Sequence, residues 1–147
     1  MIKQKTDKVM VELYIPSILG FEKVAMATAA ALAQEIGFSK DRVADLRTAV
    51  SEACLNAIEH GNQQDASVQV LVTLTVDGQE LQVDVDDQGG GIGAMPDAPD
   101  IDEKVAGNSP SRGWGMFLIQ NLVDEVRFEK TAKGGNRTRL VVHLNQQ

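Results

Sequence analysis

The chain has little cysteine, and it lacks long apolar runs. Cys54 is the only cysteine among 147 residues, which excludes an intrachain disulfide and a cysteine-based zinc site. Its apolar neighbours in a helical pattern predict a buried, unreactive thiol. No stretch approaches the roughly 18 apolar residues of a membrane-spanning helix, and the N-terminus carries no signal-peptide pattern. We therefore expect a cytoplasmic protein that does not enter a membrane.

Clustered positive charge is also missing. The net charge is −7, and the densest basic segment, residues 133–139, is interrupted by two glycines and an asparagine. Proteins that grip nucleic acid by its phosphates present a basic face, so we expect no direct contact with nucleic acid. A hydrophobic fraction of 43% and a charged fraction of 24% are ordinary for a globular protein. The length fits one domain covering residues 1–147.

Apolar periodicity predicts a strand followed by a helix at the start of the chain. Residues 8–15 alternate apolar and polar side chains, which is typical of a half-buried strand. Pro16 should end this strand, and Ser17 should cap a helix over residues 18–36 that is rich in alanine. Gly37 should end the helix.

A second helix is predicted directly afterwards. Ser39 is a good N-cap, and Asp41 lies in the first turn, where the helix dipole favours an acidic side chain. Apolar residues then recur at spacings of three and four, at Val43, Leu46, Val50, Ala53 and Ala57. Gly61 and Asn62 should close this helix.

The rest of the chain predicts strands and one long loop. Two alternating segments, 68–76 and 81–85, flank Asp77-Gly78, a strong hairpin signal. A turn-rich loop over residues 88–113, a helix over 114–122 and two strands near 126–128 and 140–144 follow. The order is β-α-α-β-β-loop-α-β-β, which predicts the α+β class: a two-layer α/β sandwich whose mainly antiparallel (mixed) sheet has helices on one face.

Three groups of residues point to chemistry, and the first lies on the second helix. Glu52 and Asn56 are four residues apart, so they share a helix face distinct from the apolar stripe. A carboxylate beside an amide oxygen suits Mg²⁺, which prefers oxygen ligands. The spacing alone fits a solvated helix face equally well.

The second group follows the predicted strand 81–85. Asp86 and Asp87 precede a segment that contains Gly89 and Gly91, whose lack of a side chain lets the backbone approach a ligand. A carboxylate at a strand end can accept a hydrogen bond from an exocyclic amine. The segment lacks the Lys-Ser/Thr of a P-loop and the directly following helix of a dinucleotide fingerprint, so both motifs are excluded.

The third group, Arg112-Gly113-Trp114-Gly115-Met116, opens the predicted helix 114–122. Free N–H groups at a helix start, beside glycines and an arginine, form an anion site. A flexible loop that leads into a helix is the alternative.

The order and separation of these groups resemble the GHKL ATPase superfamily of gyrase, heat-shock chaperones, histidine kinases and mismatch-repair ATPases. Within it, the chain most resembles the bacterial anti-sigma-factor serine/threonine kinases. Residues 49–53, 56–61, 115–119 and 124–126 carry this likeness, which extends from the first strand to about residue 144.

The resemblance implies roles for individual residues. Asn56 would bind Mg²⁺ that bridges the phosphates of ATP, Glu52 would act as general base, and Asp87 would accept the adenine amino group. Gly89 and Gly91 would shape the pocket of the base, Arg112, Gly113 and Gly115 would meet the phosphates as part of a lid, and Thr138 would support Asp87. Ile92 and Met116 are the other expected nucleotide-binding residues. The segment before Thr138, Gly134-Gly135-Asn136-Arg137, departs from the simpler Gly-Thr of the family.

The resemblance also implies a function. We expect ATP-dependent phosphorylation of a serine or threonine on a small anti-sigma-factor antagonist, alternation with binding of a sigma factor, and a homodimer. A non-catalytic, nucleotide-sensing module that sequesters a transcription regulator is the alternative. An autonomous histidine kinase is not expected, because residues 1–38 contain one predicted helix and no histidine.

Overall fold

A computed structural model describes residues 8–89, 117 and 119–144 of the chain. Its elements are β1 (Lys8–Pro16), α1 (Glu22–Ile36), α2 (Lys40–Asn56), the π-helical turn η1 (Ala57–Gly61), β2 (Gln69–Asp77), β3 (Glu80–Asp86), the 3₁₀ turn η2 (Ile119–Asn121), β4 (Glu125–Lys130) and β5 (Asn136–His143). No helix in these described ranges is long and apolar enough to cross a membrane.

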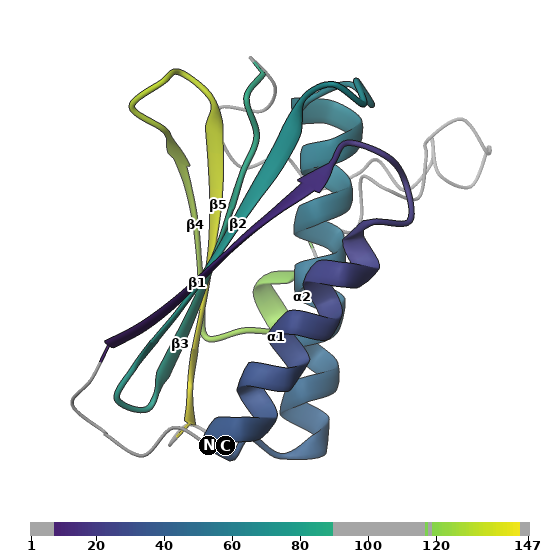
Figure 1. The fold of residues 1–147 in the computed structure, drawn as a ribbon. Coiled ribbons are helices and arrows are strands. Elements are labelled where there is room, and N and C mark those ends of the chain that lie inside the picture. The colour runs from purple at the N-terminus through teal and green to yellow at the C-terminus, as the bar shows by residue number, and fades with distance from the viewer. Residues whose placement is uncertain (1–7, 90–116, 118, 145–147) are drawn as a thin grey trace, which may run out of the picture.

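The strands form one five-stranded sheet in the order β1-β2-β3-β5-β4. Every pairing between these described strands is antiparallel. Helices α1 and α2 lie side by side against one face of the sheet (Figure 1). The predicted two-layer α+β architecture is therefore confirmed.

The core fills the space between the helices and the sheet. Alternate residues of β2 and β3 are fully or almost fully buried, as the alternating pattern predicts: Val70, Val72, Leu74, Val76, Leu81, Val83 and Val85. All five residues of the predicted apolar stripe are buried: Val43, Leu46, Val50 and Ala53 of α2, and Ala57 at the start of η1. Small side chains on the inner face of α1, including Ala25, Ala29 and Ala33, let this helix pack close to its neighbours.

Cys54 lies in this core, as predicted. Its side chain is completely buried, and the loss of hydration raises the pKa of the thiol to about 12, with a further contribution from the nearby charge of Glu22. A thiol with so high a pKa stays protonated at neutral pH and is a poor nucleophile.

The predicted starts of the two helices have different outcomes. Ser39 caps α2 as expected, because its Oγ accepts a hydrogen bond from the Arg42 N–H at 3.3 Å. The prediction that Ser17 caps a helix from residue 18 is wrong: α1 begins at Glu22. The segment before it turns at Gly20, whose φ is +108°, and the Ser17 hydroxyl instead donates to the Val68 carbonyl at 2.6 Å.

Candidate functional site

Three chain segments meet at one end of the two layers: the end of η1, the end of β3 and the turn before β5. The glycines of these segments allow the contact. A Cβ atom on Gly61 would lie 2.1 Å from Asp87 Oδ2, and one on Gly89 would lie 1.7 Å from the Gly61 carbonyl oxygen. A Cβ on Gly135 would lie 2.1 Å from the Asp87 carbonyl oxygen. Any side chain at these positions would push the segments apart, so the glycines are required for the geometry of this corner.

Asp87 is the carboxylate at the centre of this corner, and Asn136 holds it. The Asp87 N–H donates to the Asn136 carbonyl at 2.9 Å. In return, the backbone N–H and the side-chain amide of Asn136 donate to Asp87 Oδ1 at 3.3 and 3.2 Å. The Asn136 amide also donates to the Gly89 carbonyl at 3.4 Å. Sequence reasoning missed Asn136, although the unexpected segment before Thr138 marked the place.

The neighbouring carboxylate, Asp86, points to the other face of the sheet. It accepts two hydrogen bonds from Arg137, at 2.8 and 3.0 Å, and Asp84 forms the same bidentate pair with Arg139. These ion pairs join β3 to β5 across the face opposite the helices. The carboxylate of Asp86 is therefore engaged in the ion pair with Arg137 that joins β3 to β5, whereas Asp87 lies on the helix side against Gly61.

Burial perturbs the ionisation of Asp87. The loss of hydration raises the pKa of its carboxyl above 3.8, and the negative charge of Asp86 adds to this effect. Hydrogen bonds from Asn136 and Gly89 oppose the shift without cancelling it. A partly desolvated carboxylate held in one orientation is a strong and selective hydrogen-bond acceptor for an amine.

Glu52 and Asn56 lie further back along α2 from Gly61. Both residues are half-buried, and they lie one helical turn apart, about 6 Å along the helix axis. The Oε2 atom of Glu52 is shielded from solvent. The order along the helix is Glu52, Asn56 and then the corner at Gly61 and Asp87. An elongated ligand whose amine reaches Asp87 would therefore run back over Asn56 towards Glu52.

The remaining predicted residues fall into two groups. Thr138 lies in β5 opposite Val85 of β3 and Phe128 of β4, two residues beyond Asn136, and its proposed support of Asp87 stays a prediction. Gly91, Ile92, Arg112, Gly113, Gly115 and Met116 lie outside the described residues, so the proposed lid does too.

We predict that Gly61→Ala weakens ligand binding at this corner by about tenfold or more, since its methyl group must displace the Asp87 carboxylate from its bonded position. Calorimetric titration with ATP measures the effect. Gly37→Ala is the matched control: its φ of +99° strains alanine at a cost of about 1 kcal/mol or more, but the new methyl group meets nothing within 4 Å. This control should lower the melting temperature and leave ATP affinity unchanged; equal loss of affinity in both variants would contradict the account.

We also predict a pH dependence with a defined sign. As the proposed acceptor of the adenine amine, Asp87 would act in its ionised form, so its contribution to affinity should be complete above its raised pKa and lost as the pH falls through that pKa. The loss should begin at a higher pH than for an ordinary aspartate. The measurement is the ratio of affinities for ATP and purine riboside triphosphate, which lacks the 6-amino group, because their common triphosphate cancels from the ratio. A ratio that stays constant down to pH 4 would argue against Asp87 as the acceptor.

The sequence is similar to those of known proteins over most of its length. The histidine kinase-like ATPase domain family matches residues 21–142. The serine-protein kinase RsbW of Bacillus licheniformis is 32% identical over 130 residues, which cover 81% of this chain and 77% of that protein. The anti-sigma F factor of Anoxybacillus flavithermus is 28% identical over 125 residues, covering 85% of this chain and 86% of the relative.

Solved structures share the fold. The structure of the RsbU and RsbW domains of Rv1364c from Mycobacterium tuberculosis has a TM-score of 0.66 at 22% identity; it matches 92% of this chain, which spans 32% of that one. The histidine kinase domain of the blue-light-activated EL346 from Erythrobacter litoralis has a TM-score of 0.53 at 21% identity, covering 100% of this chain and 67% of that one. From the family match and the relatives together, the chain belongs to the histidine kinase-like ATPase domain family, in the group that contains the serine-protein kinase RsbW and anti-sigma F factor proteins.

Proposed function

We propose that this protein is an anti-sigma factor with serine/threonine kinase activity, which transfers the γ-phosphoryl group of ATP to a small anti-sigma-factor antagonist. The observation that carries the proposal is that Asp87 lies against Gly61 at the end of η1, while Asn56 and Glu52 lie further back along the preceding helix. The names of the relatives support the same activity, since two of the most similar groups are a serine-protein kinase and an anti-sigma factor.

Each residue has a defined task in this proposal. The Asp87 carboxylate accepts the 6-amino group of adenine and so selects and orients the base. The amide oxygen of Asn56 faces the phosphates. Glu52 orients the hydroxyl of the incoming serine or threonine and takes its proton as the new oxygen–phosphorus bond forms, while the bond from the γ-phosphorus to the bridging oxygen breaks and ADP leaves.

Mg²⁺ would be held at this site jointly by Asn56 and the nucleotide. The described residues contain no group of three or more His, Cys, Asp or Glu side chains that could hold a metal ion. The amide oxygen of Asn56 offers one hard ligand, and Mg²⁺ in kinases is ordinarily completed by phosphate oxygens and water. When bound, the ion would neutralise charge on the phosphates, and the chain contributes the positioning.

Exposed apolar side chains offer surfaces for protein partners. Ile18, Leu19 and Phe21, in the segment before α1, and Val24, in its first turn, are each between 41% and 48% exposed. Grouped apolar exposure of this kind is typical of an interaction surface, and it supports binding of the antagonist or the sigma factor. Met10 and Tyr14 of β1 are 57% and 56% exposed, and they offer apolar surface for the homodimer that we propose.

The proposal is tested by incubating the protein with Mg²⁺, γ-labelled ATP and lysate of the host cell. We expect a small protein to become labelled on serine or threonine, and the label to disappear with Glu52→Ala and with Asp87→Ala. ATP binding without label, in a lysate where a candidate antagonist is confirmed to be present, would favour the non-catalytic, nucleotide-sensing module.

A further inference from the structure

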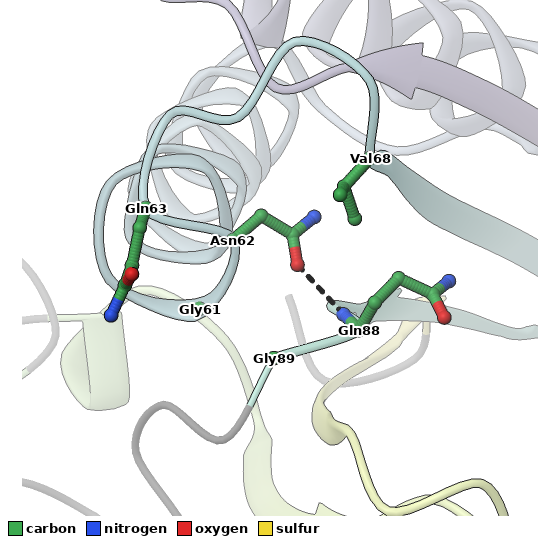
Figure 2. Close-up of a pocket in the computed structure, with 6 residues that line it drawn as sticks. All are labelled: Gly61, Asn62, Gln63, Val68, Gln88 and Gly89. Atoms are coloured by element: carbon green, nitrogen blue, oxygen red, sulfur yellow. Dashed lines mark hydrogen bonds between the residues drawn. The ribbon is translucent and has the colours of Figure 1, made fainter.

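Asn62 occupies an unusual place directly after η1. Only 5% of the residue is exposed, and its side chain joins three separate parts of the chain. Its Oδ1 accepts a hydrogen bond from the Gln88 N–H at 2.8 Å, while its Nδ2 donates to Ser17 Oγ at 3.0 Å and to the Gln69 carbonyl at 3.3 Å. Figure 2 shows this amide between the turn that carries Gly61 and the backbone of Gln88, with its oxygen directed at the Gln88 nitrogen.

The hydrogen bond to the Gln88 N–H fixes the backbone next to the proposed adenine acceptor, because Gln88 directly follows Asp87. Asn136 fixes Asp87 from the side of β5, and Asn62 fixes the next residue from the side of η1. The loop that presents the carboxylate is therefore held at two successive residues by two asparagine side chains. Without the second attachment, the backbone at Gln88 loses its anchor to η1, and the loop that carries Asp87 is held only from the side of β5.

The chemistry of the contact requires an amide. Asn62 uses one acceptor and two donor interactions at the same time, which a carboxylate or an aliphatic side chain of similar size cannot supply. The partner residue, Ser17, is completely buried, and its hydroxyl donates a hydrogen bond to the Val68 carbonyl at 2.6 Å, so the hydroxyl oxygen can accept one from Asn62. The amide is thus oriented by the β1–α1 junction and the start of β2.

We propose that Asn62 is a positioning residue for nucleotide selection: it fixes the Asp87–Gln88 backbone so that the Asp87 carboxylate meets the 6-amino group of adenine. Asn62 acts through the loop and does not touch the base. This inference rests on the proposed ATP site at Asp87.

The test is the ratio of affinities for ATP and purine riboside triphosphate, measured by calorimetric titration on Asn62→Ala and Ser17→Ala. Wild-type protein should prefer ATP by about tenfold or more, the range of a hydrogen bond to a charged acceptor. Asn62→Ala should reduce this preference to about threefold or less, because the acceptor for Gln88 is gone. Ser17→Ala removes the neighbouring hydroxyl but keeps the bond to Gln88, so the preference should remain near wild type although the melting temperature falls.

A merely structural role of Asn62 gives a different result. Asn62→Ala would then lower the melting temperature and leave the preference for ATP intact, which would overturn the inference while the ATP site stands. If Asn62→Ala does not fold, Asn62→Ser also withdraws the acceptor from Gln88 and should give the same loss of preference. If wild-type protein binds both nucleotides equally, Asp87 does not recognise the 6-amino group, and the inference is overturned. If it binds neither nucleotide, the proposed function itself is overturned.

Discussion

Replacing Glu52 with glutamine should lower the rate of phosphotransfer to the antagonist by about 10²–10⁴-fold, the usual contribution of a general base. Glutamine keeps the size and the half-buried position of the side chain but cannot take the proton of the incoming hydroxyl. ATP affinity should change little, because Asp87 and Asn56 are untouched. Single-turnover transfer of labelled phosphate to the purified antagonist measures the rate, and calorimetric titration measures the affinity.

A matched variant separates this effect from a general change of charge. Glu35→Gln makes the same substitution at an exposed position near the end of α1, away from the corner formed by Gly61 and Asp87. It should transfer phosphate at the wild-type rate. Equal rates in wild-type protein and Glu52→Gln, with ATP binding confirmed in both, would remove Glu52 from the role of general base.

Asp87→Asn should weaken ATP binding by about 10–100-fold, because the charged acceptor of the adenine amine is lost and an amide donor faces the base. The nucleotide-free protein should be as stable as wild type or more stable. Burial raises the pKa of Asp87, so above that pKa the ionised carboxyl lowers folding stability, and this cost vanishes in the neutral variant. Calorimetric titration and thermal unfolding without nucleotide measure the two effects.

The adjacent substitution, Asp86→Asn, should show the opposite pattern. It breaks the bidentate ion pair with Arg137 on the far face of the sheet and leaves Arg137 with Asp84 at 3.9 Å. The melting temperature should fall, since a largely buried pair loses one partner. ATP affinity should stay near wild type. Two neighbouring variants with the same affinity loss would contradict the assignment of Asp87 alone to the base.

The sequence predicts the regular elements well because their determinants are local. The β2–β3 hairpin follows from alternating residues around Asp77-Gly78, and the start of α2 follows from one capping serine. The start of α1 is mispredicted because a buried interaction overrides a local one: the Ser17 hydroxyl bonds to Val68, 51 residues away, instead of capping a helix.

The sequence suggests the residues of the proposed site but not the contacts that hold them in place. Glu52, Asn56 and Asp87 follow from motifs that can be read along the chain. Asn136 and Asn62 bond to residues 49 and 26 positions away, and no periodicity or spacing reveals such pairs before the sheet brings them together. Asn136 lies where the family resemblance leads one to expect a simpler Gly-Thr segment. A departure from a motif can therefore mark a residue with a contact of its own, here the hydrogen bond from Asn136 to Asp87.

The most direct test of the site is a crystal structure of the protein with Mg²⁺ and a non-hydrolysable ATP analogue. We expect the adenine amino group to lie within about 2.7–3.2 Å of the Asp87 carboxylate, with the triphosphate running along α2 past Asn56. We also expect the γ-phosphate at the end of the site nearer Glu52. An adenine ring bound elsewhere, or a triphosphate directed away from α2, would contradict the central claim that this corner is the ATP site.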